Sequence, residues 1–476
     1  MNIIDFFENN VKRYPKKNAI IIDDESISYE KLWNDVKEFS YILSKQKKES
    51  MISLISENSI SFIISYLGII KAGKIAHIAS PDISEINLVK QIDSSGSNSI
   101  ICSDKAYDKI SKYSKITIPI LKFSELKINT DMEDCNSQEN PTSHLIYTSG
   151  TTSEPKGVAI THSMIEFTTK NIIKILNYVN SDIDVLPLPL YHSFGLGCFH
   201  TSMMVGSTII LHKDSSNLES LLESIKKFNA TTIATIPATL TKFLKLDREE
   251  LNKYFSNVRL VMTNSTKIPK NTIECFREIL KNGHLATYYG LTEASRSTFM
   301  IFDEDISKDE SVGKPAPGVN IKIEDIDDAG GEILIKGNNV ISKYWNNKLA
   351  DENLVDGWLR TGDLGILDDE NFLFLKGRND EIINIGGEKV IPNEIEEKVK
   401  QISGVEDVAA FGIENEVFGQ VIKLQVVKNS ESNLDKSKIL IHCIKNLEKF
   451  KIPSKIDFVD NIPKTSYGKV KRFMLK

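Results

Sequence analysis

The segment YTSGTTSEPKG, from Tyr147 to Gly157, combines a run of hydroxyl side chains with two glycines and Lys156. Ser, Thr and Gly over so short a span form neither a good helix nor a good strand, so we expect a loop with many hydrogen-bond donors. Such a loop suits phosphate, although a Ser/Thr/Gly run is more often a solvated connector. The order Lys156, Gly157 also differs from the P-loop, which ends in Gly-Lys-Ser/Thr. The residues downstream therefore decide between the two interpretations.

Length and composition limit the classes of protein. A chain of 476 residues exceeds the size at which one core keeps growing, so at least two structural units are expected. The net charge of −6, with both signs interspersed, argues against nucleic acid as a partner. Five cysteines without a close pair argue against a disulfide framework or a structural zinc site. The N-terminus lacks a signal-peptide pattern, and the most apolar stretch, residues 60–70, is too short to span a bilayer, which predicts a cytoplasmic protein.

Apolar and amphipathic segments alternate along the chain. Residues 272–283 place apolar side chains on one helical face with Gly283 as the stop, and residues 259–265 before them read as a strand. Residues 166–176 predict a second helix, with Ser163 and Glu166 spaced as a capping box, and residues 184–193 follow as a strand that enters a loop. This rhythm predicts an α/β fold.

A domain boundary is expected near residue 376. The segment 365–374 reads as a tight hairpin that ends in Phe372 and Phe374, and a charged Gly-Arg-Asn-Asp junction follows it. The last hundred residues or so then form a separate α+β pattern. We place the hinge at Lys376 to Asp380, which divides the chain into residues 1–376 and 377–476.

Four further motifs follow the opening loop in order. They are YYGLTEAS (288–295), GWLRTGDLG (357–365), KGRNDEIINIGGEKVIPNEIE (376–396) and PKTSYGKVKR (463–472). Together with the loop they resemble the adenylate-forming superfamily, which includes acyl-CoA synthetases, adenylation domains of peptide synthetases and firefly luciferase. The resemblance covers essentially the whole chain. It implies a large N-terminal domain of mixed sheets flanked by helices, and a small mobile C-terminal α+β domain.

The resemblance implies a reaction in two halves. A carboxylate attacks the α-phosphate of ATP to give an acyl-adenylate and pyrophosphate, and a thiol then displaces AMP to give a thioester. ATP, Mg²⁺ and CoA, or the phosphopantetheine of a carrier protein, are the implied cofactors. In the first half one anion approaches another, so cations and fixed donors have to offset the repulsion.

The motifs assign residues to the nucleotide. The resemblance gives the β- and γ-phosphates to Thr148, Ser149, Gly150, Thr151, Thr152 and Lys156. It gives the α-phosphate to Thr292, Mg²⁺ to Glu293, the adenine face to Tyr289, and the ribose to Asp363 and Arg378. A hard cation held by one carboxylate and phosphate oxygens is the expected chemistry for magnesium. Taken alone, Glu293 reads as a solvated acid at a helix start, and Asp363 as part of a turn.

Other residues are assigned to the conformational change. The resemblance makes Lys469 the lysine that bridges the attacking carboxylate and the α-phosphate, and Asp380 the hinge residue. Gly386 and Gly387 would let a pantetheine arm pass close to the backbone, although the pair also reads as a tight turn. Outside the motif, Lys469 reads as a solvated charge in a basic tail.

The acid pocket is expected around His192, Ser193, Gly195 and Asn264. His192 resembles a histidine that gates the carboxylate site in many acyl-CoA synthetases, whereas alone it reads as a wall residue. No carboxylate near His192 and Ser193 can pair with a buried ammonium, so an amino-acid substrate is disfavoured. The residues around Gly195 predict an apolar acid, while Asn264 and Ser265 add polar atoms to the opposite wall.

Three hypotheses follow. The first is an AMP-forming acid-CoA ligase that takes a small-molecule carboxylic acid. The second is a stand-alone adenylating enzyme that loads a phosphopantetheinyl carrier protein. The third, a catalytically silent nucleotide-binding module, is disfavoured because Lys469, Asp363 and Glu293 are all retained.

Overall fold

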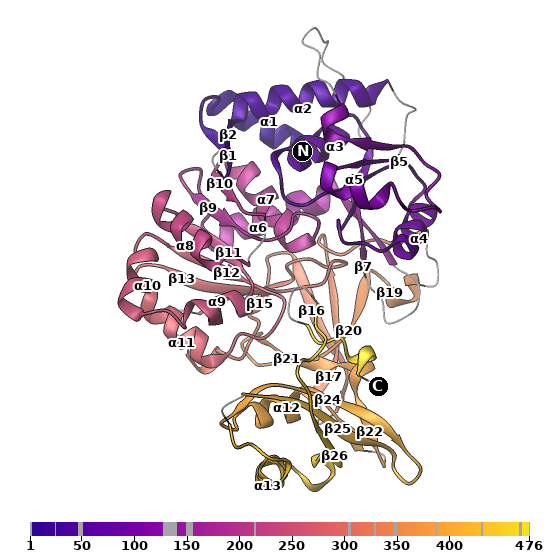
Figure 1. Ribbon diagram of the computed structural model, residues 1–476, viewed down its shortest axis with the longest axis vertical. Helices are drawn as coiled ribbons and strands as arrows, with labels where there is room; N and C mark the ends of the chain where they lie inside the picture. The colour runs from indigo at the N-terminus through magenta and orange to yellow at the C-terminus, as the bar shows by residue number, and fades with distance from the viewer. Residues whose placement is uncertain are drawn as a thin grey trace.

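The computed structural model describes residues 2–23, 25–45, 51–126, 140–148, 156–213, 216–302, 306–327, 330–346, 350–386, 388–429, 432–465 and 469–475. These residues form four sheets flanked by helices, and the smallest globular part lies at the C-terminal end of the chain. In Figure 1 this part, in orange and yellow, stands below the rest of the molecule.

A nine-stranded sheet runs in the order β15-β14-β13-β12-β11-β9-β10-β1-β2. Its central pairs, from β13 to β1, are parallel, and the pairs at both edges are antiparallel. The buried strands are short apolar runs, as expected when helices cover both faces of a parallel sheet. The strands are β1 (Asn18–Ile22), β2 (Glu25–Ser28), β9 (Ile183–Leu186), β10 (Thr208–Leu211), β11 (Thr232–Thr235), β12 (Leu260–Thr263), β13 (His284–Tyr289), β14 (Thr298–Ile301) and β15 (Lys314–Pro315).

A seven-stranded sheet runs in the order β18-β8-β7-β4-β3-β5-β6. It is parallel from β7 to β6 and antiparallel at the β7-β8 and β8-β18 pairs. The strands are β3 (Met51–Ile55), β4 (Ile75–Ala79), β5 (Ser97–Cys102), β6 (Ile120–Lys122), β7 (Thr142–Thr148), β8 (Lys156–Thr161) and β18 (Tyr344–Trp345).

Helices cover both sheets and join them into one core. The helices before residue 300 are α1 (Ile3–Arg13), α2 (Tyr29–Ser44), α3 (Ile60–Lys71), α4 (Glu85–Ser95), α5 (Asp104–Ile110), α6 (His162–Leu176), α7 (Ser193–Val205), α8 (Leu218–Lys227), α9 (Pro237–Phe243), α10 (Arg248–Tyr254) and α11 (Lys270–Ile279). Nine of the ten residues from Phe194 to Met203 in α7 are buried, and they lie on all faces of the helix. A helix that is buried on every face is enclosed by other elements. The largest apolar cluster contains residues of both sheets together with α3 and α7.

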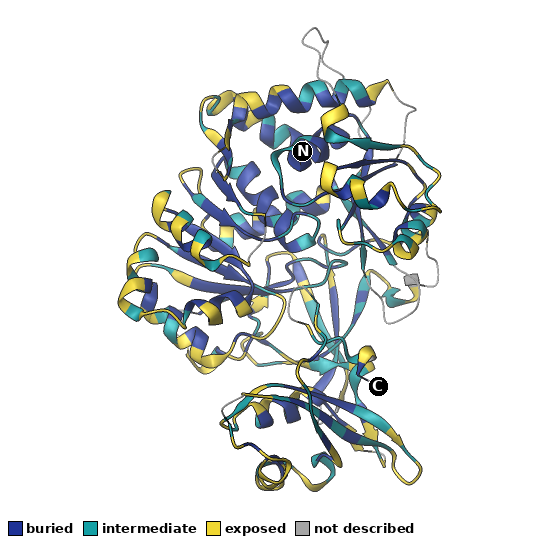
Figure 2. Cartoon of the chain, in the orientation of Figure 1, coloured by how far each residue is buried: buried dark blue, intermediate teal, exposed yellow. Residues whose placement is uncertain are grey.

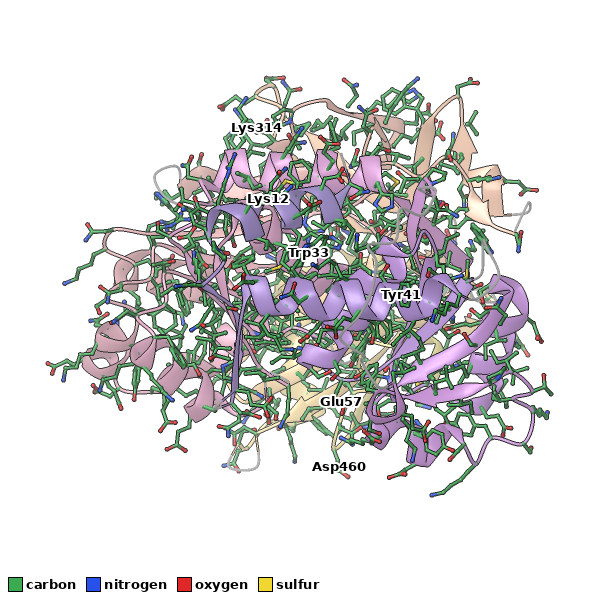
Figure 3. The ribbon with its side chains drawn as sticks, turned by 90° about the horizontal axis from the view of Figure 1, so that it is seen from above. Lys12, Trp33, Tyr41, Glu57, Lys314 and Asp460 are labelled. Atoms are coloured by element: carbon green, nitrogen blue, oxygen red, sulfur yellow. The ribbon has the colours of Figure 1, made fainter. Side chains whose placement is uncertain are left out.

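The N-terminal helices close the end of the molecule away from the C-terminal part. Seen from above, α1 with Lys12 and α2 with Trp33 and Tyr41 lie side by side (Figure 3). The Phe7 and Trp33 rings join them with centroids 5.5 Å apart, near perpendicular. Figure 2 shows the buried residues concentrated on the inner faces of these helices and in the sheets.

A third sheet links the two sheets above to the C-terminal part. Its order is β16-β17-β20-β19, and β21 pairs with β20. The strands are β16 (Val319–Asp327), β17 (Gly330–Gly337), β19 (Leu354–Val355), β20 (Trp358–Leu367) and β21 (Leu373–Arg378). The predicted hairpin at 365–374 is confirmed: Asp368 Oδ1 accepts hydrogen bonds from the amides of Glu370 and Phe372, and Asn371 takes a left-handed conformation with φ of 65°.

The C-terminal part has a sheet of its own. Its order is β23-β22-β25-β24, with β26 paired to β25. The elements are β22 (Ile383–Ile385), β23 (Glu388–Val390), α12 (Pro392–Lys400), β24 (Val405–Asn415), β25 (Gly419–Lys428), α13 (Lys436–Asn446) and β26 (Lys455–Phe458). One face of this sheet packs on α12 and α13 in a cluster separate from the main core. On β24, Ala409 and Phe411 pack against Ile462 and Leu475 of the terminal segment.

The α/β fold with a large N-terminal and a small C-terminal domain is confirmed, while two local predictions are wrong. Helix α6 begins at His162, and its N-cap is Thr161, whose hydroxyl accepts a hydrogen bond from Met164 N; Ser163 and Glu166 therefore form no capping box. Helix α11 ends at Ile279, so Gly283 does not stop it. A Cβ at Gly283 would lie 2.7 Å from the Val258 carbonyl oxygen, and close packing accounts for that glycine.

None of the helices in the described ranges has both the length and the apolar composition that a bilayer crossing requires.

Candidate active site

Two strand ends frame the loop that opened the sequence analysis. Thr148 is the last residue of β7, Lys156 is the first residue of β8, and the two residues are direct partners in the antiparallel pair. Ser149, Gly150, Thr151 and Thr152 lie outside the described residues. The loop therefore leaves and re-enters the seven-stranded sheet at one place.

Glu293 lies at the same place although it is distant in sequence. It is half-buried in the turn after β13, and its Oε1 accepts hydrogen bonds from Thr148 Oγ1 at 3.4 Å and from Tyr344 Oη at 3.3 Å. The Lys156 ammonium lies 5.8 Å from the centroid of the Tyr344 ring. Burial raises the pKa of Glu293, against a lowering by these two hydroxyls and the Lys156 charge. The structure thus brings together the predicted Thr148, Lys156 and Glu293, and adds Tyr344.

A second cluster forms around Asp363 on β20. Its Oδ2 accepts a hydrogen bond from Tyr289 Oη at 2.7 Å, and its Oδ1 accepts one from Arg378 Nη1 at 3.1 Å. Asp363 and Arg378 are cross-strand partners on β20 and β21, which places their side chains on one face. Arg378 also donates from Nε to Asp380 Oδ1 at 3.0 Å. The predicted Tyr289, Asp363, Arg378 and Asp380 therefore form one connected group.

The turn between Tyr289 and Glu293 connects the two clusters. Tyr289 ends β13 and contacts Asp363, while Glu293, four residues later, contacts Thr148. Thr292 lies between them and lines a small cavity. One short turn therefore supplies the Tyr289 phenol, the Thr292 hydroxyl and the Glu293 carboxylate in sequence order. The Ser/Thr/Gly loop begins near the Glu293 end of the turn, and Asp363, a carboxylate suited to two hydroxyls, lies at the Tyr289 end.

The predicted acid pocket lies at the start of α7. His192 is the N-cap residue of this helix and Ser193 its first residue. The His192 ring lies 4.7 Å from the Tyr191 ring, and burial lowers the pKa of His192 to about 4. The imidazole is therefore neutral near pH 7. Ser193 lines the same cavity as Thr292.

Gly195 has a packing role that the sequence analysis did not foresee. A Cβ at this position would lie 2.3 Å from the Pro189 carbonyl oxygen and 2.9 Å from that of Leu188. The absence of a side chain thus lets α7 approach the backbone of residues 188–189. Gly195 does not line the cavity next to Ser193.

That cavity has a volume of about 40 Å³, and its wall combines apolar surface with a few polar side chains. Its lining comes from β7, β8, α6, α7, the turn after β13 and the segment after β17. The residues are His144, Ile160, Met164, Ile165, Thr168, Ser193, Leu196, Gly197, His200, Thr292, Ser295, Arg296 and Asn339. No carboxylate stands among the described residues that line it. The apolar part of this lining comes from Ile160, Met164, Ile165, Leu196 and Gly197, and the charge in it comes from Arg296.

Asn264 follows β12 and is half-buried. Burial raises the pKa of Tyr288 to about 12, against a lowering by Arg296 and by the Asn264 amide, which places all three side chains in one neighbourhood. Ser265, the next residue, has a positive φ of 91°. Asn264 thus lies next to Tyr288, and neither residue lines the cavity beside Thr292.

Sequence reasoning missed Arg296 and Tyr344. Arg296 comes immediately after the motif YYGLTEAS, and its guanidinium carbon lies 4.9 Å from the centroid of the Tyr288 ring. The signal that could have found Arg296 is a cation that directly follows a motif assigned to the nucleotide and Mg²⁺. Tyr344 had no such signal, because only the pairing of β18 with β8 brings it to Glu293.

The remaining predicted residues lie in the C-terminal part. Lys469 is exposed, and its described hydrogen bonds are backbone contacts with Thr465. Within the described residues, the structure does not bring Lys469 into contact with Thr148, Glu293 or Asp363. Gly386 takes a left-handed φ of 59° in the turn between β22 and β23, where its amide donates to the Phe418 carbonyl at 2.9 Å. Gly387 lies outside the described residues.

The boundary between the two parts is polar and partly exposed. Lys267 Nζ lies 2.6 Å from Glu397 Oε1 on α12, with both side chains about half exposed. Arg472 instead ties the terminal segment to the C-terminal part, with Nη1 2.7 Å from Glu381 Oε2 and Nη2 2.7 Å from Glu396 Oε1.

The site residues fit a nucleotide and a hard cation. Within the described part of the chain, no group of three or more His, Cys, Asp and Glu side chains could hold a metal by itself. A single half-buried carboxylate, Glu293, beside the ends of a Ser/Thr/Gly loop is the arrangement expected when phosphate oxygens supply the other ligands of Mg²⁺. A carboxylate with two oxygens and about four lone-pair positions can accept hydrogen bonds from a ribose in addition to those from Tyr289 and Arg378.

Comparison with known proteins gives the same result over the whole chain. The AMP-binding enzyme family matches residues 7–345, and the C-terminal domain of AMP-binding enzymes matches residues 394–469. The chain is 28% identical to the 2-succinylbenzoate–CoA ligase of Listeria monocytogenes, over 99% of this chain and 98% of that protein. It is also 28% identical to the long-chain-fatty-acid–CoA ligase of Escherichia coli, over 100% of this chain and 94% of that protein.

The solved structures include o-succinylbenzoate CoA synthetase (MenE) from Bacillus subtilis in complex with its acyl-adenylate intermediate. It is 27% identical with a TM-score of 0.88, and the match covers 99% of this chain and 97% of that chain. The same synthetase in complex with ATP and a magnesium ion is 26% identical with a TM-score of 0.86, covering 99% of this chain and 98% of that chain.

Proposed function

The chain belongs to the family of AMP-binding enzymes, and on that premise we propose how its residues carry out the reaction of an AMP-forming acid-CoA ligase. The enzyme uses ATP, Mg²⁺ and CoA. In the first half-reaction a carboxylate oxygen of the acid bonds to the α-phosphorus of ATP, the bond to the β-phosphate oxygen breaks, and pyrophosphate leaves. In the second, the sulfur of CoA bonds to the acyl carbon, the acyl–phosphate bond breaks, and AMP leaves.

The observation that carries the assignment of roles is the turn from Tyr289 to Glu293. At one end of this turn, the Tyr289 hydroxyl donates to Asp363, a carboxylate suited to a ribose, at 2.7 Å. At the other end, Glu293 accepts a hydrogen bond at 3.4 Å from Thr148, which begins the Ser/Thr/Gly loop. A nucleotide that lies along this turn has its ribose at Asp363 and its phosphates at Thr148 and Lys156. The α-phosphate then falls at Thr292, next to the cavity that would take the acid.

We assign the nucleoside to Tyr289, Asp363 and Arg378. The Tyr289 ring would cover the adenine, and Asp363 would accept both ribose hydroxyls, because a carboxylate is the natural acceptor for two adjacent O–H donors. Arg378 holds the Asp363 carboxylate in place from the neighbouring strand. Arg378 stays protonated: burial lowers its pKa, but the carboxylates of Asp380 and Asp363 raise the pKa by more.

We assign the β- and γ-phosphates to the loop of Thr148, Ser149, Gly150, Thr151, Thr152 and Lys156. Donors fixed in this loop would stabilise the charge that develops on the leaving pyrophosphate, and they need no rearrangement at the moment of reaction. Glu293 would hold Mg²⁺ together with phosphate oxygens, and the bound ion would neutralise phosphate charge. The hydroxyls of Thr148 and Tyr344 orient the Glu293 carboxylate for this role.

We assign the reacting carboxylate to the start of α7 at His192 and Ser193, of which Ser193 lines the cavity. The neutral imidazole of His192 can donate or accept a hydrogen bond without adding charge, which suits a gate between the two steps. Lys469 would supply the cation that bridges the attacking carboxylate and the α-phosphate. Because Lys469 belongs to the C-terminal part, its arrival requires that part to move.

We therefore propose residues 1–376 as the AMP-binding and acid-binding domain and residues 377–476 as the mobile C-terminal domain, with the hinge at 376–380. Residues 376–378 are the end of β21, so rotation would occur at the short 3₁₀ turn Asn379–Glu381, which contains Asp380. The opposite orientation would bring Gly386 and Gly387 to the site, where a pantetheine arm needs close access to backbone.

The alternative acceptor of the acyl group is a carrier protein. The thiol arm of a carrier protein ends in the same phosphopantetheine as CoA, so a stand-alone enzyme that loads such a carrier is the alternative. We also propose the cytoplasm as the location, because the described cysteines Cys102, Cys198, Cys275 and Cys443 are free, as expected in a reducing compartment.

The test is ATP–pyrophosphate exchange with a panel of acids, followed by mass analysis of products formed with CoA. The panel contains 2-succinylbenzoate, long-chain fatty acids, short aliphatic and aromatic acids, and the proteinogenic amino acids. We expect at least one acid to stimulate exchange and to yield an acyl-CoA and AMP. Exchange without thioester on CoA, but with thioester on a carrier protein, would select the alternative acceptor, and absence of exchange with every acid would refute the proposal.

A further inference from the structure

Arg296 is a buried cation in the wall of the acid cavity. Only 4% of the residue is exposed. Its Nη1 donates to Ser295 Oγ at 2.7 Å and its Nη2 to the Phe194 carbonyl at 3.3 Å, whereas the buried Nε has no hydrogen-bond partner within the described part of the chain. A guanidinium carries five N–H donors, and these contacts do not satisfy all of them.

The local backbone is built around this side chain. Arg296 has a positive φ of 57°, a conformation that costs free energy for a residue with a side chain. On the facing helix α7, a Cβ at Gly197 would lie 2.1 Å from Arg296 Nη2. Only glycine at position 197 leaves room for the guanidinium where it stands. The strained turn at Arg296 and the glycine on α7 therefore both set the position of the guanidinium.

No anion in the described structure compensates the charge. No Asp or Glu oxygen of the described residues lies within 4.0 Å of the Arg296 guanidinium nitrogens, and the cavity lining contains no carboxylate. The nearby Cys198 is a neutral thiol, because burial raises its pKa to about 12, and Tyr288 is a neutral phenol for the same reason. A buried charge without a partner is strongly unfavourable.

The two histidines of the cavity do not change this balance. His144 Nδ1 and His200 Nε2 share hydrogen bonds with Tyr66 Oη, at 3.1 Å and 2.8 Å. Burial lowers the pKa of His144 to about 3 and lowers that of His200 well below its usual value. Both rings are therefore neutral, and the net charge of the cavity wall is that of Arg296.

The reacting carboxylate is a poor partner for this cation. That carboxylate loses its charge when it becomes the acyl group of the adenylate, so a fixed cation bound to it alone, without the contact to the α-phosphate that we propose for Lys469, would stabilise the substrate more than the product of the first step. Such binding lowers the rate of the chemical step. A second anionic group on the acid keeps its charge through both half-reactions and avoids this penalty.

We propose that the acid carries a second carboxylate, which pairs with Arg296 in the cavity beside Thr292 while the first carboxylate reacts. This inference rests on the proposed function and adds the class of substrate, a dicarboxylic acid. The cavity of about 40 Å³ has room for roughly three water-sized groups, which is enough for a carboxylate beside Arg296 and too little for a long alkyl chain. The same cation repels the ammonium of an amino acid.

The test compares acids that differ only in the second carboxylate. The pairs are glutarate and pentanoate, adipate and hexanoate, and 2-succinylbenzoate and 4-oxo-4-phenylbutanoate, each assayed by pyrophosphate exchange. We expect at least one diacid to exceed its monoacid by about a hundredfold in kcat/KM. Equal use of monoacids and diacids would overturn the inference and leave the proposed function intact. Inactivity of every acid tested, including the fatty and amino acids, would overturn both.

The variant Arg296→Met then tests whether Arg296 causes the preference for diacids. We expect the diacid KM to rise at least about thirtyfold and the monoacid KM to change little, while the KM for ATP stays the same. Gly197→Ala, which displaces the guanidinium, should lower the diacid preference in the same way, and Arg296→Lys should keep part of it. A matched control is Arg259→Met, which removes a guanidinium paired with Asp182 at 2.5 Å that does not line the cavity.

Folding of each variant is checked by the rise in Tm that ATP produces. The control should lose stability without a change in acid preference. An undiminished diacid preference in folded Arg296→Met and Gly197→Ala would overturn the assignment to Arg296.

Discussion

Replacement of Asp363 by alanine tests the ribose end of the site. In the structure the Asp363 carboxylate accepts from Tyr289 Oη at 2.7 Å and from Arg378 Nη1 at 3.1 Å, and we propose that it also accepts both ribose hydroxyls of ATP. A hydrogen bond to a charged group contributes about 1.5–3 kcal/mol, so the loss of two removes about 3–6 kcal/mol from ATP binding. The lower value already corresponds to more than about a hundredfold in affinity.

The same substitution affects stability less than ATP binding. It leaves the buried Tyr289 hydroxyl without its carboxylate, which costs about 1 kcal/mol, at the lower end of the usual range because the Thr361 side chain is an alternative partner. Arg378 keeps the Asp380 carboxylate at 3.0 Å. The variant should therefore fold, with a modest fall in Tm.

The assay is initial-rate kinetics of AMP formation with varied ATP, together with thermal unfolding. Because the ribose contacts exist in both the ground and the transition state, we expect KM for ATP to rise about a hundredfold or more and kcat to change much less. Tyr289→Phe is the matched control, since it removes the hydroxyl but keeps the ring and the carboxylate, and it should change KM less than tenfold. The double variant should regain the stability lost by Asp363→Ala and keep its high KM. A KM for ATP within threefold of the wild-type value in Asp363→Ala would refute the ribose assignment.

Three further predictions concern the phosphate end and the mobile domain. Lys156→Ala should lower kcat/KM in pyrophosphate exchange by a factor that corresponds to about 2–4 kcal/mol, because it removes a donor from the leaving group; unchanged exchange would contradict this role. Without Mg²⁺, burial raises the pKa of Glu293, so protons compete with Mg²⁺ for this carboxylate and the KM for Mg²⁺ should rise with decreasing pH; Glu293→Gln should lose this pH dependence and most of the activity, and a wild-type pH dependence of that KM retained in the variant would assign it to another group. Lys469→Ala should abolish adenylate formation yet convert a supplied acyl-adenylate and CoA into thioester, and Gly386→Leu should do the reverse; equal damage to both steps in either variant would exclude the two-orientation mechanism.

Local periodicity predicted elements well where one face of a helix is apolar. Ile273, Phe276 and Ile279 are spaced for one face, and all three are buried in α11. The start of α6 differs from the prediction because two hydroxyl residues, Thr161 and Ser163, compete for the cap, and the geometry that decides between them is the extended backbone of Thr161, with ψ of 160°. Hydroxyl residues near a helix start indicate a cap but do not fix its position.

The nucleotide site was accessible from sequence only through ordered motifs. Thr148 and Glu293 are 145 residues apart, and no local pattern predicts the hydrogen bond between them. The acid pocket was harder still, because its character comes from contacts between segments. Nothing in the sequence connects Gly197 with Arg296, yet the absence of a side chain at Gly197 leaves space for the Arg296 guanidinium. Gly195, by contrast, appeared to belong to the pocket and instead packs against backbone.

The central claim is that a carboxylate oxygen of the acid attacks the α-phosphorus of ATP. The direct test is a single-turnover reaction with an acid whose carboxylates are labelled with ¹⁸O, followed by mass analysis of AMP, pyrophosphate and inorganic phosphate. The mechanism predicts one ¹⁸O atom in each AMP, because the bridging oxygen of the adenylate stays with phosphorus when the thiol attacks the acyl carbon. Label in inorganic phosphate or pyrophosphate, or AMP without label, would contradict it.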